Sequence, residues 1–299
     1  MVGCAADADD LLQETFVRFL EKAPVGDGRP LKPWLVRVAL NLARDLLRRR
    51  RRTPYVGPWL PSPVASAFGQ DEEGVEAFEV ATRGFTTEGR YDLLESMTMA
   101  FLVALEALTP QQRAVLLLRD VFDYSVRETG AALGSTPAAV KAAHARARRC
   151  MEGYEGSREP SLAVAKDKAR EALWDFAEAL ATGDLTRVEG MLAADARAFS
   201  DGGGEFYAAL NPIEGALNVA RFYTGIMAKF GSPGRVAMVD LGGRAALLVE
   251  RPEERLAGVP PRMAARVAPR FVLQVDLNRD GRIARLYSVL ATRKLTHVG

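Results

Sequence analysis

The chain has 299 residues, with 40 basic and 38 acidic side chains, so its formal net charge is only +2. This length allows two or three domains, because single domains usually span about 100–200 residues. Two cysteines, Cys4 and Cys150, and two histidines, His144 and His297, are a poor supply for a disulfide scaffold, a zinc site or a catalytic triad. The absence of an apolar stretch of roughly 20 residues argues against a membrane helix. We therefore expect a soluble, cytoplasmic protein with no metal or other cofactor and no membrane partner.

Two helices are expected near the N-terminus. Residues 7–22 place leucines and phenylalanines at helical spacing opposite an acidic side. After a loop rich in proline and glycine, a second helix runs from about Pro33 to Arg52, and its end carries an unbroken arginine run. Cations at a helix C-terminus complement the helix dipole, but five in succession exceed that need. They predict a phosphate-binding surface formed by Arg48, Arg49, Arg50, Arg51 and Arg52.

From Thr53 to about Arg90, proline, glycine and acidic residues increase and helical periodicity fades, which predicts a linker. Helical periodicity returns near Tyr91. The segment 109–150 then has the pattern of a helix-turn-helix, because capping boxes at Thr109 and Ser125 and a turn at Gly134 separate three short helices. The last of these helices begins at Thr136 and Pro137.

This last helix is strongly basic on one side. Val140, Ala143 and Ala147 can face a partner helix, which directs Lys141, His144, Arg146, Arg148 and Arg149 outward. Such a helix would place its first residues on base edges in the major groove and its later arginines on phosphates. The alternative interpretation is a solvated basic face on a helical bundle.

Beyond about Ser157 the pattern changes. Helices are expected at 162–181, 184–193 and 213–230, followed by strands at 235–241, 244–250, 267–276 and 282–291. Helices followed by a curved antiparallel sheet predict an α+β domain. The run 276–283 matches the opening of a calcium-binding loop, but Tyr287 stands where the bidentate glutamate belongs, so we expect a hairpin turn there.

Two segments resemble a known family. The run Thr109 to Val115, with Arg119 to Phe122, Tyr124, Ser125, Glu128 and residues 133–149, resembles region four of the extracytoplasmic-function sigma factors, which belong to the sigma-70 type. The runs Asp7 to Phe16, Pro33 to Leu35 and Asn41 to Asp45 resemble region two of the same family. The resemblance implies an all-α region two, an all-α helix-turn-helix region four, and two partners, core RNA polymerase and promoter DNA.

It also implies roles for particular residues. An acidic helix surface would dock on core polymerase through Asp9, Asp10, Gln13 and Glu14. The segment Trp34 to Arg52 would recognise and melt the downstream promoter element, with Trp34, Asn41 and Arg44 joining the arginine run. Residues 125–149, including Thr136, would bind the upstream element.

The remainder resembles the SigJ-like subgroup of these factors, which carries a fused, cone-shaped SnoaL-like domain that controls activity in place of a separate anti-sigma protein. The resemblance implies a regulatory contact between linker residues and a glycine-rich turn. The residues concerned are Trp59, Leu60, Pro61, Pro63, Asp201, Gly202, Gly203 and Gly204. Three positions depart from the subgroup pattern: Ser62 replaces a glutamate, Glu205 replaces a basic residue, and residues 291–295 read Ala-Thr-Arg-Lys-Leu.

Family members also have a helix before Asp7, where this chain has six residues, so region two is N-terminally truncated as written. We expect that the start has been assigned too far downstream, because apolar residues such as Leu12 and Phe16 would otherwise lose burial worth roughly 1.5–3 kcal/mol each.

The expected organisation is region two at 1–52, a linker at 53–92, region four at 93–155 and a regulatory domain at 162–299. Two other functions stay open. One is a helix-turn-helix regulator that acts without polymerase and senses a small molecule in the cone of its tail. The other is an enzyme of the isomerase or cyclase kind, with Asp195, Asp201 or Asp240 as the carboxylate in the cone. We expect no catalytic residue.

Overall fold

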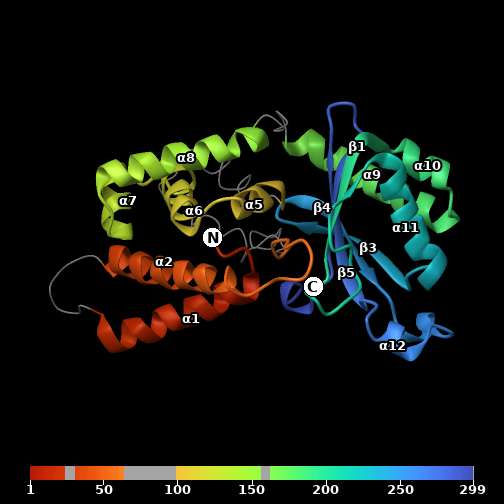
Figure 1. The fold of residues 1–299 in the computed structure, drawn as a ribbon, viewed down its shortest axis with the longest axis horizontal. Helices are drawn as coiled ribbons and strands as arrows, with labels where there is room; N and C mark the ends of the chain where they lie inside the picture. Colours follow the sequence, from red (N-terminus) through yellow and green to blue (C-terminus); the bar gives the residue numbers. More distant parts are fainter. Residues whose placement is uncertain (24–30, 64–98, 156–161, 299) are drawn as a thin grey trace. The chain divides into compact units, whose positions relative to one another are not determined.

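The computed structural model describes residues 1–23, 31–63, 99–155 and 162–298 (Figure 1). These residues fall into two compact units. The first unit contains residues 1–54 and 99–155, and the second contains residues 55–63 and 162–298. Much of the expected linker, with its acidic run at 71–79 and the expected start of a helix near Tyr91, lies outside the described residues.

The described part of the first unit is entirely helical, in agreement with the predicted all-α regions. Its elements are α1 (Ala5–Lys22), α2 (Leu31–Arg50), α5 (Met99–Glu106), α6 (Pro110–Leu116), a π-helical turn η1 (Leu117–Val121), α7 (Val126–Leu133) and α8 (Pro137–Glu155). Helix α1 packs against α2, and α2 also contacts α6 and α7. A small core joins α6, α7 and α8 around Val115, Leu118 and Val140, with Val36 and Leu40 of α2 packed against it.

The capping signals in the sequence act as expected. Thr109 and Ser125 each accept a hydrogen bond from the backbone N–H three residues later, and Gln112 and Glu128 return the bond, so both capping boxes are complete. Helix α7 ends at Gly134, which has the left-handed backbone angle φ of 60° that glycine adopts without strain. The sequence did not predict that the helix beginning at Pro110 changes at Leu117 into a π-helical turn, where Phe122 N donates to Leu117 O at 2.9 Å.

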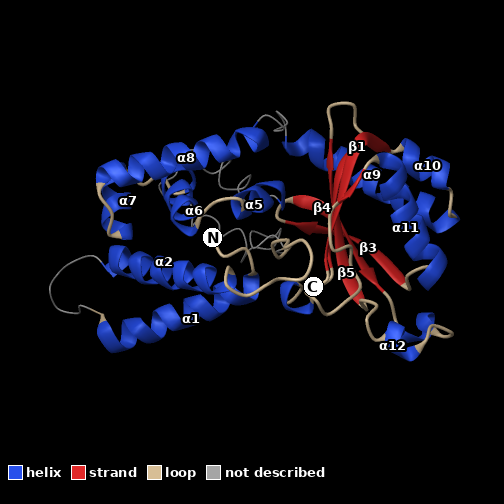
Figure 2. Ribbon diagram, viewed as in Figure 1, coloured by secondary structure: helices blue, strands red, loops and turns tan. Residues whose placement is uncertain are grey.

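The second unit has the predicted α+β architecture (Figure 2). Its helices and short turns are α9 (Leu162–Thr182), α10 (Leu185–Gly190), α11 (Ala216–Phe230), η2 (Glu253–Leu256), α12 (Pro261–Ala264) and η3 (Thr292–Lys294). Its strands are β1 (Leu192–Asp201), β2 (Ile213–Glu214), β3 (Arg235–Leu241), β4 (Arg244–Glu250), β5 (Arg270–Leu277) and β6 (Ile283–Val289), which form one sheet in the order β2-β1-β6-β5-β4-β3.

Two details of the sequence prediction are wrong for this sheet. Strand β1 begins at Leu192, inside the helix expected at 184–193, and the whole of β1 was missing from the expected strands. The sheet is also not purely antiparallel, because β1 and β6 run parallel, with Phe199 opposite Tyr287. Parallel neighbours need a long crossover, and the chain between these strands supplies α11 and four further strands, β2, β3, β4 and β5.

The expected hairpin turn is confirmed between β5 and β6. Asn278 N donates to Arg282 O at 2.8 Å, and the side-chain oxygen of Asn278 accepts from the backbone N–H groups of Asp280 and Arg282. Leu277 pairs with Ile283 across the turn.

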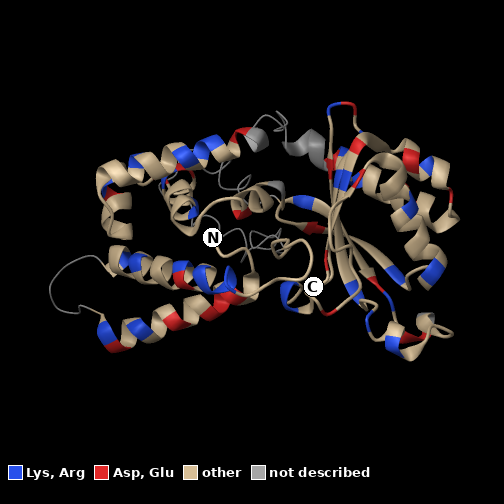
Figure 3. Ribbon diagram, in the orientation of Figure 1, with Lys and Arg blue, Asp and Glu red and all other residues tan. Residues whose placement is uncertain are grey.

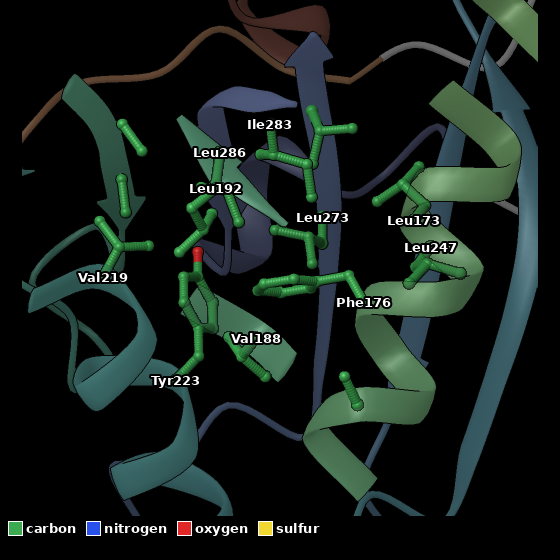
Figure 4. Close-up of a cluster of buried hydrophobic side chains, with 14 of the residues drawn as sticks. Leu173, Phe176, Val188, Leu192, Val219, Tyr223, Leu247, Leu273, Ile283 and Leu286 are labelled. Carbon is green, nitrogen blue, oxygen red and sulfur yellow. The ribbon is translucent and has the colours of Figure 1, made fainter. Parts of the chain in front are cut away.

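Apolar side chains fill the space between the helices and one face of the sheet (Figure 4). Leu173 and Phe176 of α9 and Tyr223 of α11 meet Leu273 and Leu286 of the sheet, and all five are buried. The rings of Phe176 and Tyr223 meet edge to face with centroids 5.5 Å apart. The Tyr223 hydroxyl is satisfied by a 2.9 Å hydrogen bond with Ser288. The cone expected from the family resemblance is therefore packed with side chains at this level.

No helix in the part of the chain that the structure describes is long and apolar enough to span a membrane.

Candidate functional site

The helix-turn-helix presents the N-terminal half of α8 to solvent. Val140, Ala143, Ala147 and Met151 are buried at helical spacing, which fixes the opposite side of α8 as the outer face. Thr136 caps the helix, because its hydroxyl accepts a hydrogen bond from Ala139 N at 3.2 Å. The first turns of α8 are thus held rigidly at the end that would approach base edges.

The basic residues predicted on this face are exposed, with one exception. Lys141, Arg146, Arg148 and Arg149 are exposed. Figure 3 shows that basic positions recur along α8. His144 is half-buried, and its Nε2 lies 2.6 Å from Asp120 Oδ1 in η1. The prediction of an outward His144 therefore needs amending, since this ring is engaged within the helix-turn-helix.

The arginines of the expected phosphate-binding surface differ in their contacts. Arg48, Arg49, Arg51 and Arg52 are exposed, and Arg48 forms an exposed ion pair with Asp45 at 2.9 Å. Arg50 instead lies 2.5 Å from Asp7 of α1 and donates to Val2 O at 2.8 Å.

Arg51 donates to Leu108 O at 2.8 Å, which links the end of α2 to the turn after α5. Arg50 and Arg51 thus fasten the end of α2 to its neighbours, and Arg51 is exposed in the same way as Arg48, Arg49 and Arg52.

The remaining residues of α2 lie on the same helix at different depths. Asn41 is exposed, whereas Trp34 and Arg44 are half-buried. Partial burial, together with the nearby charge of Arg48, lowers the pKa of Arg44 below its usual value. The carboxylate of Asp45 acts in the opposite direction.

Helix α1 exposes both its acidic and part of its apolar side. Asp9, Asp10, Gln13 and Glu14 are all exposed, and Glu14 pairs with Arg18 at 2.8 Å. Leu12, Phe16 and Leu20 form an exposed apolar ridge one turn apart, with Leu12 56% and Phe16 53% exposed. Leu12 and Phe16 are thus exposed in this structure, while Leu11 and Phe19 are half-buried.

Within the second unit, the linker residues Tyr55 to Pro63 pack around one carboxylate of the α+β part. Asp201 ends β1 and is fully buried. Its Oδ2 accepts from Leu60 N at 2.7 Å and from the Lys294 ammonium, and its Oδ1 accepts from Tyr55 OH at 2.5 Å and from Gly203 N at 3.0 Å. Four donors, one of which is the Lys294 ammonium, offset the cost of burying this charge. We call this arrangement the Asp201 clamp.

Lys294 completes the clamp from the far end of the chain. Its ammonium pairs with Asp201, donates to Leu60 O at 2.5 Å, and lies 3.9 Å from the ring centroid of Trp59 and 4.9 Å from that of Tyr55. A cation over two aromatic rings is favourable, most of all where water is excluded. The predicted regulatory residues Trp59, Leu60 and Asp201 are thus brought together.

The absence of side chains in the glycine-rich turn leaves the space that the clamp needs. A side chain at Gly202 would place its Cβ 2.5 Å from Phe206 O, and one at Gly203 would meet Ala291 Cβ at 2.8 Å. Gly203 and Gly204 have φ angles of 62° and 78°, which disfavour other residues. Pro61 and Pro63 are buried in the docked linker.

Tyr55 and Lys294 were not among the predicted site residues. Lys294 carried a usable signal, because the Lys-Leu pair at 294–295 keeps the subgroup pattern in a segment that otherwise departs from it. Tyr55 had none, since a single tyrosine in a loop has no periodicity or spacing to single it out.

The carboxylates considered for catalysis lie outside the apolar cluster. Asp195 is exposed on β1, Asp201 is held in the clamp, and Asp240 of β3 is half-buried. Within the described ranges no group of three or more His, Cys, Asp or Glu side chains could hold a metal ion.

Two family descriptions match the chain: "Sigma-70 region 2" at residues 1–53 and "Sigma-70, region 4" at residues 98–151. The "ECF RNA polymerase sigma factor SigJ" of Mycobacterium tuberculosis is 30% identical over 99% of this chain and 88% of its own length. The "RNA polymerase sigma factor CarQ" of Myxococcus xanthus is 32% identical over 53% of this chain and 77% of its own.

A solved structure supports the same relationship. The crystal structure of the Mycobacterium tuberculosis extracytoplasmic function sigma factor SigJ matches with a TM-score of 0.70 and 25% identity, over 99% of this chain and 91% of that one. The similarity thus includes the second unit, which confirms the resemblance to sigma factors with a fused SnoaL-like domain. The chain belongs to the extracytoplasmic-function sigma factors of the sigma-70 family.

Proposed function

We propose that this sigma factor directs core RNA polymerase to its promoters through two DNA-reading surfaces, and that the second unit controls them in cis through the Asp201 clamp. In this proposal residues 1–52 are region two, 53–92 the linker, 93–155 region four and 162–299 the regulatory domain. The protein would act in the cytoplasm, where polymerase and promoters are found.

The DNA-reading part of the proposal is supported by exposed cations on two helices. On α8 they are Lys141, Arg146, Arg148 and Arg149. At the end of α2 and in the turn after it they are Arg48, Arg49, Arg51 and Arg52. A protein that neutralises DNA phosphates with such side chains releases counterions, so its binding weakens as salt rises. The exposed face of α1, with Asp9, Asp10, Gln13 and Glu14, is assigned to core polymerase.

The regulatory part is carried by one observation: the linker segment that follows region two is bound by a buried ion pair of the second unit. The linker joins the two promoter-reading regions, so a domain that grips it limits how those regions can separate. Either holding or releasing the segment would alter the ability of the factor to span a promoter.

The experiment is transcription in vitro by reconstituted holoenzyme from a cognate promoter. Three forms are compared: the full chain, a chain without residues 162–299, and Trp59→Ala, which removes the ring facing Lys294. We expect both altered forms to change the initiation rate in the same direction. Equal activity of all three forms would refute control in cis, while failure of every form to bind core polymerase or initiate would refute the sigma-factor mechanism itself.

A ligand-sensing tail is the weaker candidate. The apolar cluster that fills the cone includes Leu173, Phe176 and Tyr223, so a small molecule would have to displace well-packed side chains. Catalysis in the tail has still less support, because Asp195 is exposed and the Asp201 carboxylate is engaged by four donors.

A further inference from the structure

Asp120 places an acidic group inside the basic region of the helix-turn-helix. Its Oδ1 lies 2.6 Å from His144 Nε2, and its Oδ2 lies 3.5 Å from Arg148 Nη1. His144 and Arg148 are one turn apart on α8, so one carboxylate spans two successive positions of the DNA-facing helix. Each carboxylate oxygen is engaged with a different side chain.

The π-helical turn brings Asp120 to this place. A π-turn contains one residue more than the α-helical register, which rotates the residues that follow by about 100°. In η1 this keeps Leu118 and Val121 buried while Asp120 faces α8. Arg119 Nη1 donates to Tyr124 O and ties the turn to the loop that precedes α7. Single π-turns of this kind occur often at functional positions.

The acidic group affects the two α8 residues differently. The His144 side chain is only 22% exposed, so its bond to Asp120 mainly links the first and last helices of the motif. The Arg148 side chain is 53% exposed and has a longer contact, so it remains able to reach solvent. Lys141, which lies two turns before Arg148, is exposed at the end of α8 that would meet base edges.

We propose that Asp120 is a specificity-determining residue: by holding His144 and Arg148, it restrains phosphate contacts that any DNA sequence can satisfy. Phosphate contacts supply affinity without sequence information, whereas base-edge contacts supply discrimination. An acid that competes with phosphate for Arg148 lowers the sequence-independent part of the affinity and leaves the contribution of Lys141 intact. This inference rests on the proposed DNA-binding role of α8.

The test measures binding of reconstituted holoenzyme to two duplexes. One is a promoter that the unaltered holoenzyme selects from a randomised library, and the other has the same promoter with its upstream element scrambled. Asp120→Asn keeps the shape of the side chain and removes its charge. We expect Asp120→Asn to tighten binding to the scrambled duplex. The slope of log K against log salt concentration should become steeper there by about 0.9, the value of one added phosphate contact. The ratio of the two affinities, which measures discrimination, should fall about fivefold.

A matched control separates this effect from a general change of charge. Asp123→Asn makes the same charge change three residues away, at an exposed position whose carboxylate makes no ion pair within the described residues. Asparagine also tolerates the positive φ of 51° at this position. We expect Asp123→Asn to leave discrimination unchanged, and equal effects of the two variants would overturn the proposal.

Arg148→Gln supplies a second measurement that does not depend on how Asp120→Asn folds. Because Arg148 is restrained in the unaltered protein, we expect its removal to change binding to the scrambled duplex little, and a large loss there would overturn the proposal. In the double variant, Asp120→Asn should no longer tighten binding. Lys141→Gln tests the underlying DNA-binding role of α8. If Lys141→Gln changes binding to neither duplex, the assignment of the DNA-binding face is wrong. If Lys141→Gln changes binding but Asp120→Asn does not, only the proposed role of Asp120 is refuted.

Discussion

Asp201 and Lys294 form an ion pair in the interior of the second unit, although 93 positions separate them in the chain. The side chain of Asp201 is fully buried and that of Lys294 is 6% exposed. Leu60 contacts both partners, since its N–H donates to Asp201 and its carbonyl accepts from Lys294. The backbone of the linker is thus a third member of the ion pair.

Asp201→Asn should release the linker from the second unit. Breaking a buried ion pair costs about 3–5 kcal/mol, because the remaining charge is left without its partner. We expect amide hydrogen exchange at residues 55–63, and at the N–H of Leu60 above all, to accelerate by about a hundredfold or more. Mass spectrometry of the peptide that covers this segment measures the effect.

Asp195→Asn is the matched control for this change. Asp195 lies on the same strand as Asp201 but is exposed. Its replacement should leave exchange in the linker as it is. Unaltered exchange in Asp201→Asn would mean that the clamp does not hold the linker in solution.

Replacing Gly202 by alanine should destabilise the second unit, whereas the same change at Gly225 should not. The new Cβ at position 202 would lie 2.5 Å from Phe206 O and 3.0 Å from Ala208 Cβ, so backbone must move, at a cost of about 1–3 kcal/mol. Gly225 lies on the exposed side of α11 with nothing within 4 Å, and alanine there gains about 0.5–1 kcal/mol of helix stability.

Thermal unfolding followed by circular dichroism would give opposite shifts in the transition of the second unit for the two alanine variants. A similar shift in both would show that the close approach at Gly202 is not what constrains the turn.

The sequence predicted the helical elements well because each carried its own local signals. Thr109, Ser125 and Gly134 mark helix ends by side-chain and backbone chemistry that does not depend on the rest of the fold. Strand β1 had no comparable signal. Its alternation of apolar and polar residues rests on Ala194, Ala196 and Ala198, and it contains no β-branched residue, so both the alternation and the strand propensity were weak.

Candidate site residues that belong to a sequence motif could be predicted. Contacts between residues that are distant in the sequence could not. Trp59, Leu60 and Asp201 were found from the family pattern. The roles of Arg50 and His144 differ from expectation because their partners, Asp7 and Asp120, lie 43 and 24 positions away. Which member of a basic run is engaged within the protein depends on such long-range contacts, and composition does not reveal them.

The arginine run should therefore divide by function. Arg49→Gln removes an exposed cation, so we expect the slope of log K for promoter binding against log salt concentration to become shallower by about 0.9. The free energy of unfolding should change by no more than about 0.5 kcal/mol. Arg50→Gln breaks the ion pair with Asp7 and the bond to Val2 O, so it should destabilise the first unit by about 1–3 kcal/mol. Denaturant unfolding and a salt titration of holoenzyme binding distinguish the two. Equal stability of both variants would contradict the fastening role of Arg50.

The packing of the cone predicts an alkaline loss of stability in the second unit. Burial raises the pKa of Tyr223 to about 12, although its hydrogen bond with Ser288 acts in the opposite direction. An unfolded tyrosine titrates near its ordinary value of 10, so between these two values the folded chain binds more protons than the unfolded chain. The contribution of Tyr223 is thus complete below pH 10 and is lost as the pH rises toward about 12, with a slope of up to about 1.4 kcal/mol per pH unit.

Denaturant unfolding across this pH range, compared with Tyr223→Phe, isolates the contribution of this residue. Phenylalanine keeps the edge-to-face contact with Phe176 and cannot ionise, so its stability should fall less steeply. Ultraviolet absorbance should show one tyrosine fewer titrating late in the variant. A Tyr223 that titrates near pH 10 would mean that water reaches the cone, and the case for a ligand-binding cavity in the regulatory domain would then be reopened.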